Sequence, residues 1–379
     1  MAGRNLKGTK RVVVKVGSSS ITGTGGEPDA GRLAGLAGQV AALKGNGTEV
    51  LLVSSGAVAA GVGRLGLAAR PSTIPEKQAC AAVGQGIIMQ VYEKLFSGHG
   101  LIAGQVLLTR GDLADRGRFL NARNTLNTLL HLGVVPVINE NDTVAVEEIN
   151  FGDNDFLSAL VAGLVDADLL CLLTDIDGFY TADPRVDAGA RLIPTVAAIT
   201  PELESSAGGP GTTRGSGGMA SKLAAARVAV QCGTAVVVAH SRERDVLPRI
   251  LAGEELGTFF RPGATRLEHR KRWIAHGAPA AGRVEVDGGA VRALVRGGKS
   301  LLPSGVLGVE GCFEAGTTVG IFGADGREVA RGIVNFNSRE LTMIKGRQTG
   351  EIEGLLGHKD YDEVVHRNNM VLMTRVPGG

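Results

Sequence analysis

Short apolar runs alternate with longer amphipathic stretches over the first two thirds of the chain. The runs are rich in Val, Ile and Leu, which is typical of strands that are covered on both faces. They span residues 12–17, 50–56, 100–108, 134–139, 169–175 and 235–239. Helical patterns between and after them span residues 29–43, 76–96, 118–131 and 218–231. This alternation predicts an α/β fold with a mostly parallel sheet sandwiched by helices.

The pattern changes near residue 261 and predicts a second, smaller domain. The run RPGATRLEHRKRW begins at Arg261 and carries five Arg or Lys against one Glu, and GAPAAG (277–282) then reads as a linker. Alternating segments such as RVEVDGG and TTVGIF predict small β structure. We therefore expect a large domain at 1–262, a linker at 263–281, a β-rich domain at 282–367 and a tail at 368–379.

Composition and charge limit the classes of function. A chain of 379 residues is too long for one ordinary core, which agrees with two domains. The formal net charge is only +2, so bulk charge points neither to nucleic acid nor to a membrane surface. The four cysteines form no CxxC pair, and Asp166 and Asp168 interrupt the apolar stretch at 156–173. We expect buried free thiols, no membrane span and a reducing, cytoplasmic location.

The loops that follow the apolar runs are the first candidates for a site, because ligands bind beyond the carboxyl ends of parallel strands. Lys15 lies inside the first run, and the small residues 17–20 follow it. A buried lysine needs an anionic partner such as phosphate, whereas an edge-strand lysine would reach solvent. Residues 54–57 form a donor-rich corner after the second run, which suits a carboxylate or simply caps a helix.

The densest polar cluster follows the fourth apolar run. Residues 139–142 (Asn-Glu-Asn-Asp) come directly after it, and residues 153–155 (Asp-Asn-Asp) open an apolar helix. Such carboxylates and amides could bind an amino group, hydrogen-bond a substrate or organise Mg²⁺. Two Asx-rich turns and a helix cap are the alternative, but a cap accounts for one such residue and not for seven.

Two further strand-end segments point to a nucleotide. Thr174 and Asp175 end the fifth run, where they could contact nucleotide or metal, or form a plain turn. The Gly-rich segment 208–218 enters a helix whose first turn carries Lys222, which makes a phosphate site or a flexible surface loop. There is no Walker A motif, and the GxGxxG string at 61–66 follows a helix-prone segment, so we do not interpret it as a dinucleotide fingerprint.

Taken in order, these segments resemble the amino acid kinase family. The matching motifs are VVVKVGSS, VSSGAVAAG, LLTR with RFLNARNT, VPVINEND, FGDNDFLSAL, LLTDIDGFYTADPR and GSGGMASK. The C-terminal part, with LLPSGV and GREVARGIVNFNS, resembles a PUA domain. The resemblance implies ATP-dependent phosphorylation of the side-chain carboxylate of L-glutamate to L-glutamate 5-phosphate, which is the first step of proline biosynthesis.

The resemblance also implies roles for single residues. It assigns catalysis to Lys15, Lys222 and Asp155, and Mg²⁺ to Asp153 and Asp155. Glutamate is expected at Ser55, Gly56, Ala57, Asn139, Asp142 and Asn154. ATP is expected at Lys15, Thr174, Asp175, Ser216, Gly217, Gly218, Met219, Ala220, Ser221 and Lys222.

The expected partners are glutamate, ATP with Mg²⁺, further copies of the chain in a dimer or tetramer, and the reductase that acts on glutamate 5-phosphate. Sibling kinases act on aspartate, N-acetylglutamate or a nucleoside monophosphate, but the C-terminal domain type and the INEND/GDND pairing argue against them. A PUA domain also raises RNA binding. From Arg283 to Gly379, however, 12 Arg or Lys balance 12 Asp or Glu, and affinity for a phosphate backbone grows with cationic contacts. We expect no RNA partner.

Overall fold

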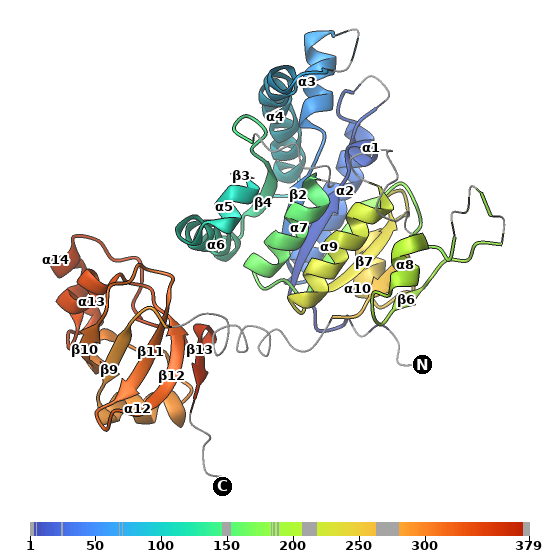
Figure 1. The fold of residues 1–379 in the computed structure, drawn as a ribbon. Helices are drawn as coiled ribbons and strands as arrows, with labels where there is room; N and C mark the ends of the chain where they lie inside the picture. Colours follow the sequence, from blue (N-terminus) through green and yellow to red (C-terminus); the bar gives the residue numbers. More distant parts are fainter. Residues whose placement is uncertain are drawn as a thin grey trace. The chain divides into compact units, whose positions relative to one another are not determined.

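The structure is a computed structural model of the chain. It describes residues 4, 6–23, 26–67, 69, 71–145, 153–182, 184, 186–187, 189–206, 218–262 and 280–373. The chain divides into two compact units, Met1–Ala264 and Thr265–Gly379 (Figure 1). Each unit has its own sheet and its own hydrophobic core.

The first unit is built on an eight-stranded sheet with the order β3-β4-β2-β1-β5-β7-β8-β6. Its strands are β1 (Arg11–Val16), β2 (Glu49–Ser54), β3 (Ala103–Leu108), β4 (Val135–Glu140), β5 (Leu169–Thr174), β6 (Thr195–Val196), β7 (Ala235–His240) and β8 (Thr258–Phe260). Every described pairing in it is parallel except the one between β7 and β8. The carboxyl ends of β1, β2, β4 and β5 therefore meet at one edge.

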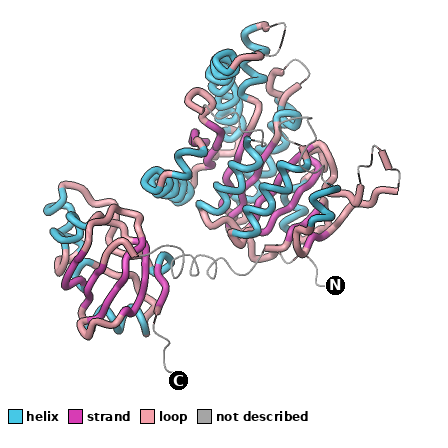
Figure 2. The backbone as a smooth tube through the Cα atoms, in the orientation of Figure 1, coloured by secondary structure: helices cyan, strands magenta, loops and turns pink. Residues whose placement is uncertain are grey.

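Helices cover both faces of this sheet (Figure 2). They are α1 (Ser18–Ile21), α2 (Ala30–Gly45), α3 (Ala57–Leu65), α4 (Ile74–Ser97), α5 (Arg110–Ala114), α6 (Arg116–His131), α7 (Asp153–Leu164), α8 (Pro201–Ser206), α9 (Met219–Gln231) and α10 (Val246–Leu251). Val12 and Val14 of β1 join the core under α2, α4 and α10, whereas Val13 joins the core under α6, α7 and α9. The pleat of a strand thus decides which helical layer each side chain meets.

The helices α3 and α4 touch through their backbones. A Cβ atom at Gly61 would lie 1.8 Å from the carbonyl oxygen of Cys80, and one at Gly84 would lie 1.8 Å from that of Ala57. Neither position can therefore carry a side chain without displacing a helix. The GxGxxG string lies within α3 and at its C-cap, Gly66, which agrees with our reading that it is no dinucleotide fingerprint.

The second unit is a mixed five-stranded sheet with the order β10-β9-β11-β12-β13. Its strands are β9 (Arg283–Val286), β10 (Val306–Glu310), β11 (Thr318–Gly323), β12 (Glu328–Ile333) and β13 (Met370–Leu372). Its helices are α12 (Gly288–Val295), α13 (Ser338–Ile344) and α14 (Ile352–Leu356), with 3₁₀ turns η1 (Pro303–Gly305), η2 (Thr349–Glu351) and η3 (Arg367–Asn369). β9 pairs in parallel with β11, and the other pairings are antiparallel.

The expected fold class is confirmed: a mostly parallel α/β sheet and a separate β-rich unit. All six apolar runs are strands, and the four helical patterns correspond to α2, α4, α6 and α9. β13 pairs with β12, so this sheet extends past residue 367 into the segment that we expected to be a tail. Residues 263–279 of the expected linker lie outside the described residues. None of the described helices is both long and apolar enough to cross a membrane.

Candidate active site

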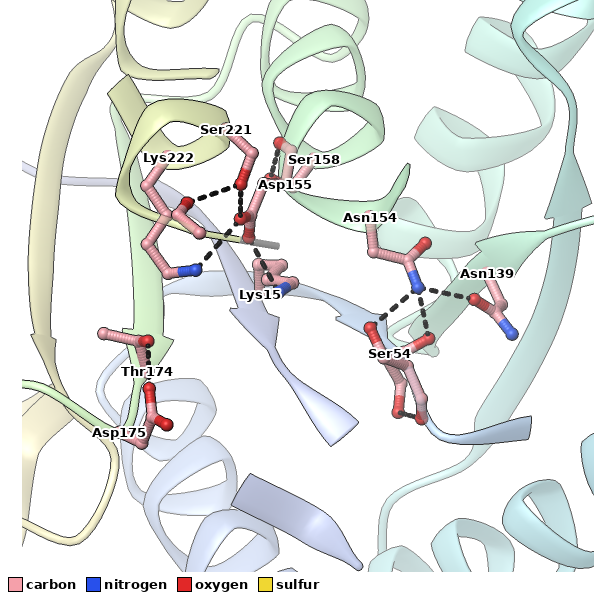
Figure 3. A network of polar contacts seen from close by, with 12 residues as sticks. Lys15, Ser54, Asn139, Asn154, Asp155, Ser158, Thr174, Asp175, Ser221 and Lys222 are labelled. Carbon is pink, nitrogen blue, oxygen red and sulfur yellow. Dashed lines mark hydrogen bonds and ion pairs between the residues drawn. The ribbon is translucent and has the colours of Figure 1, made fainter. Parts of the chain in front are cut away.

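Three charged side chains from three elements meet at the carboxyl edge of the large sheet. Lys15 comes two residues after Val13 along β1. Because every second side chain of a strand points to the same face, both point to the face that α7 and α9 cover. Asp155 lies in the first turn of α7, and Lys222 lies in the first turn of α9. Nζ of Lys15 is 2.7 Å from Oδ1 of Asp155, and Nζ of Lys222 is 3.1 Å from Oδ2 (Figure 3).

This lysine–carboxylate–lysine cluster is almost completely buried. Asp155 is 1% exposed, and Lys15 and Lys222 are 7% and 6% exposed. Burial alone would raise the pKa of Asp155, but the two ammonium groups and the hydroxyl of Ser221 outweigh it and hold that pKa below its ordinary value. The carboxylate is therefore ionised at neutral pH. Two ammonium groups thus lie side by side on Asp155, an arrangement that suits a phosphate group.

The start of α9 adds main-chain donors beside Lys222. The helix begins at Met219, and its N-cap residue is Gly218, which has no side chain to cap the first turn. The first N–H groups of a helix and its dipole together favour an anion. Oγ of Ser221 lies 2.9 Å from Oδ2 of Asp155 and 2.7 Å from the carbonyl oxygen of Gly218, so it ties α9 to α7.

Amide and hydroxyl groups form a second cluster on the neighbouring strand ends. Nδ2 of Asn154 donates to Oγ of Ser55 at 2.8 Å and to Oδ1 of Asn139 at 2.9 Å. The same nitrogen lies 3.4 Å from the carbonyl oxygen of Ser54. Successive helical residues point about 100° apart, so Asn154 faces the ends of β2 and β4 while Asp155 faces the lysines (Figure 3). One helical turn thus serves both clusters.

The corner between β2 and α3 depends on a glycine. Gly56 has a φ of 97° and is the N-cap residue of α3, which begins at Ala57. A Cβ atom at Gly56 would lie 3.3 Å from side-chain atoms of Ile88 and Thr22. A larger residue would be strained in its backbone and crowded in its surroundings, so this corner requires glycine.

Asp142 lies half-buried in the turn that follows β4, three residues after Asn139. The main-chain N–H of Asn141 donates to the carbonyl oxygen of Leu108 at 3.0 Å. The hydroxyl of Thr143 donates to Oδ1 of Asn141 at 2.6 Å. These bonds hold the turn against β3 and so fix where Asp142 stands.

Thr174 and Asp175 lie at the end of β5, next to the end of β1. Oγ1 of Thr174 donates to Oδ1 of Asp175 at 3.0 Å (Figure 3). The N–H of Ser241 donates to the carbonyl oxygen of Thr174 at 2.7 Å. The structure therefore brings these two predicted residues to the edge that carries the lysine cluster. The predicted residues Ser216 and Gly217 lie outside the described residues.

A cleft of about 480 Å³ opens on the other face of the same strand ends. Val16 and Leu173 line it together with Ser20, Leu36 and Gln39. Val16 and Leu173 belong to the core under α2, which is opposite to the face that Lys15 meets. The lysine cluster is therefore separated from this cleft by the sheet itself.

The profile of the amino acid kinase family matches residues 10–240, and that of the PUA domain matches residues 282–356. This chain belongs to the amino acid kinase family. Proteins named glutamate 5-kinase from Moorella thermoacetica, Geobacter sp. strain M21 and Carboxydothermus hydrogenoformans are 53%, 55% and 54% identical to it. Each comparison covers 97% of this chain, and 97%, 99% and 99% of the respective relative.

Among solved structures, a UMP kinase from Bacillus anthracis is similar to 68% of this amino acid kinase and to 97% of its own chain. The TM-score is 0.48 and the sequence identity is 17%. At this level the likeness carries no functional argument.

One of the two predicted Mg²⁺ ligands, Asp155, is engaged by lysines in the described structure. Both carboxylate oxygens of Asp155 already face ammonium groups, those of Lys15 and Lys222. The side chain of Asp153 is not among those that the structure describes. In the described part of the chain, no group of three or more His, Cys, Asp or Glu side chains could hold a metal. Asp155 fits the role of a counter-ion to the lysines.

Three polar side chains that the sequence analysis did not single out reach this edge from α4. They are Gln78, Gln85 and Tyr92, and each hydrogen-bonds to a segment that carries predicted glutamate residues. Their seven-residue spacing is visible in the sequence. It carried no signal, because glutamines on a helix more often form a solvated face.

Proposed function

We propose that this amino acid kinase transfers the γ-phosphate of ATP to the side-chain carboxylate of L-glutamate, giving L-glutamate 5-phosphate, the first step of proline biosynthesis. The observation that carries the phosphoryl transfer is the buried pair of lysines that meet on the carboxylate of Asp155. The names of relatives that are 53–55% identical over 97% of the chain support glutamate as the acceptor.

The chemistry needs positive charge more than it needs a base. The side-chain carboxylate of glutamate has a pKa of about 4.3, so it is already ionised at neutral pH and can attack phosphorus directly. The obstacle is the approach of two anions and the charge that spreads over the transferred group. Lys15 and Lys222 supply that charge, and Asp155 holds both ammonium groups in place before substrate arrives.

We assign the substrates to the two clusters. Glutamate lies against the amide cluster of Ser55, Asn139 and Asn154, with Asp142 and the corner at Gly56 and Ala57 completing its site. ATP lies over the ends of β1 and β5. Its phosphates meet Lys15 and the start of α9, residues 218–222, and the rest of the nucleotide extends past Thr174 and Asp175.

Mg²⁺ belongs with ATP in this proposal. Protein-bound Mg²⁺ usually keeps waters and substrate phosphates as ligands and takes only one or two carboxylates. Asp155 is engaged by two lysines, so it does not fit as such a ligand, and no step above depends on it as one.

Hydroxylamine trapping tests the acceptor directly, because acyl phosphates react with hydroxylamine to give coloured hydroxamates with iron. Purified full-length chain is incubated with ATP, Mg²⁺ and either L-glutamate, L-aspartate or N-acetyl-L-glutamate. We expect hydroxamate with glutamate at least about tenfold faster than with the other two, since one misfitted group in a polar site costs tenfold or more. Equal or faster reaction with aspartate or N-acetylglutamate would reject glutamate as the substrate.

We also propose a location, an assembly state and a partner for this enzyme. We place the enzyme in the cytoplasm as a dimer or tetramer, and we propose that its labile product passes to a reductase. Cys80 and Cys171 are buried free thiols, as expected, which suits a reducing compartment. Cys232 and Cys312 are exposed, so the expectation of burial is wrong for these two. Light scattering of the purified chain tests the assembly, and a monomer at micromolar concentration would reject it.

A further inference from the structure

The long helix α4 carries a ladder of three polar side chains, Gln78, Gln85 and Tyr92, spaced seven residues apart. Seven residues make about two helical turns, so the three lie on one face at intervals of about 10 Å. Nε2 of Gln78 donates to the carbonyl oxygen of Ala145 at 3.2 Å, and the hydroxyl of Tyr92 lies 2.9 Å from Oγ of Ser54. Each thus holds a segment next to the amide cluster.

Gln85, the middle member of the ladder, continues into that cluster as a chain of amides. Nδ2 of Asn139 donates to Oε1 of Gln85 at 2.7 Å, and Oδ1 of Asn139 accepts from Nδ2 of Asn154 at 2.9 Å. Asn139 is 4% exposed, so both ends of its amide need partners within the protein. Gln85 supplies the partner for one end and Asn154 for the other.

The donors and acceptors along this row of amides are oriented in one direction. The main-chain carbonyl of Ser54 can only accept, and it faces Nδ2 of Asn154, as does the hydroxyl of Ser55. Both hydrogens of that nitrogen are therefore engaged within the protein. Oδ1 of Asn154 points the other way: it is buried and has no hydrogen-bond partner among the residues that the structure describes. A buried acceptor without a partner is costly unless a ligand supplies a donor.

We propose that Gln85 is a positioning residue for substrate selection, because together with the carbonyl of Ser54 it fixes, through Asn139, which way the amide of Asn154 faces. With Gln85 as an acceptor, Asn154 offers its oxygen to the ligand, and that oxygen selects a donor such as the α-ammonium of a free amino acid. This inference rests on the proposed function, in which glutamate lies against this cluster. Without Gln85, Nδ2 of Asn139 loses this acceptor, so Asn139 no longer holds Nδ2 of Asn154 firmly on its side and the oxygen of Asn154 is less well aimed at the ligand.

The test compares Gln85→Met, which keeps the length and apolar stem but removes the acceptor, with Gln85→Glu, which keeps an acceptor. Gln90→Met is the matched control, because Gln90 is an exposed residue of the same helix outside the ladder. For each full-length variant, kcat and KM are measured with L-glutamate, with glutarate, which lacks the α-ammonium, and with ATP.

For Gln85→Met we expect the glutamate KM to rise about five- to tenfold, as for the loss of one well-oriented hydrogen bond. Its kcat, its ATP KM and its kcat/KM for glutarate should stay within about twofold to threefold, so the preference for glutamate over glutarate narrows. Gln85→Glu and Gln90→Met should keep that preference. An unchanged glutamate KM in Gln85→Met, or an equal loss with glutamate and glutarate, overturns the positioning role. If the unmodified chain fails to phosphorylate glutamate, the proposed function itself is rejected.

Discussion

Replacing Asp155 by Asn tests whether its carboxylate holds in place the two lysines to which we assign catalysis. The amide has nearly the same shape but no charge, so Lys15 and Lys222 lose their shared counter-ion while remaining buried. At an effective dielectric constant of about 20, unit charges at these two separations attract by about 6 and about 5 kcal/mol. The burial of all three groups opposes this attraction.

Removing one partner of a buried ion pair costs about 3–5 kcal/mol, and the remaining amide oxygen can still accept from one ammonium, so we take about 3 kcal/mol. For a unit of this size, each kcal/mol shifts the melting temperature by about 2–4 °C, which predicts a fall of about 6–12 °C. The kcat should fall at least about a hundredfold, since the lysines no longer stand where charge develops.

Differential scanning calorimetry at neutral pH measures the shift. Asp166→Asn is the matched control, because Asp166 forms a more exposed pair with Arg123 at 2.9 Å, and such pairs contribute about 0–1 kcal/mol. A fall in melting temperature for Asp155→Asn no larger than that for Asp166→Asn would refute the reasoning.

The pH dependence gives a second check of the same prediction. Folding lowers the pKa of Asp155 from its ordinary value of 3.8, so its stabilisation is fully present above that value and is lost as the pH falls through the lowered one. The difference in melting temperature between the wild-type protein and Asp155→Asn should therefore be constant from neutral pH to about pH 5 and shrink below about pH 4. A gap that widens in acid would contradict the sign.

Three other changes probe the two clusters and the core. Lys222→Met should lower kcat by about 10²–10³-fold while calorimetric binding of glutamate persists, because the lysine acts on the phosphoryl group; a normal kcat would remove it from catalysis. Asp142→Ala should raise the glutamate KM about tenfold or more, as for a lost charge-assisted hydrogen bond, and an unchanged KM would remove it from the substrate site. Burial raises the pKa of Cys171 to about 12, so a thiol reagent should label the exposed Cys232 and Cys312 quickly and Cys171 only after unfolding; fast labelling of a third thiol would contradict this.

The sequence predicted the edge of the sheet where the site lies, because apolar runs of five to nine residues end in polar residues there. It predicted that Lys15 needs an anion, and the structure supplies Asp155 from α7. The local pattern alone could not say which member of the Asp153–Asp155 segment does this, and only the family resemblance pointed to Asp155. The answer depends on how α7 is rotated about its own axis relative to the sheet. That rotation places Asn154 in one cluster and Asp155 in the other.

Elements without a strong local pattern escaped prediction for a different reason. β8 is three residues long and runs antiparallel to β7, and β6 has only two residues, so neither has a period to detect. The ladder on α4 escaped because a glutamine contact is set by tertiary packing. Nothing in the spacing of Gln78 and Gln85 says that strand ends, and not water, lie beside them.

The close contact between α3 and α4 limits which substitutions this part of the fold can accept. Gly84 and Gly86 are two residues apart on one helix, yet a Cβ atom at Gly86 meets nothing within 4 Å while one at Gly84 strikes the backbone of Ala57. Ala57 begins the helix that follows the corner at Gly56, where we propose that glutamate binds, so a single methyl group at Gly84 would push on that corner from behind. A side chain can therefore be added at Gly86 but not at Gly84. The shape of the proposed substrate site thus depends on a helix that need not touch the substrate.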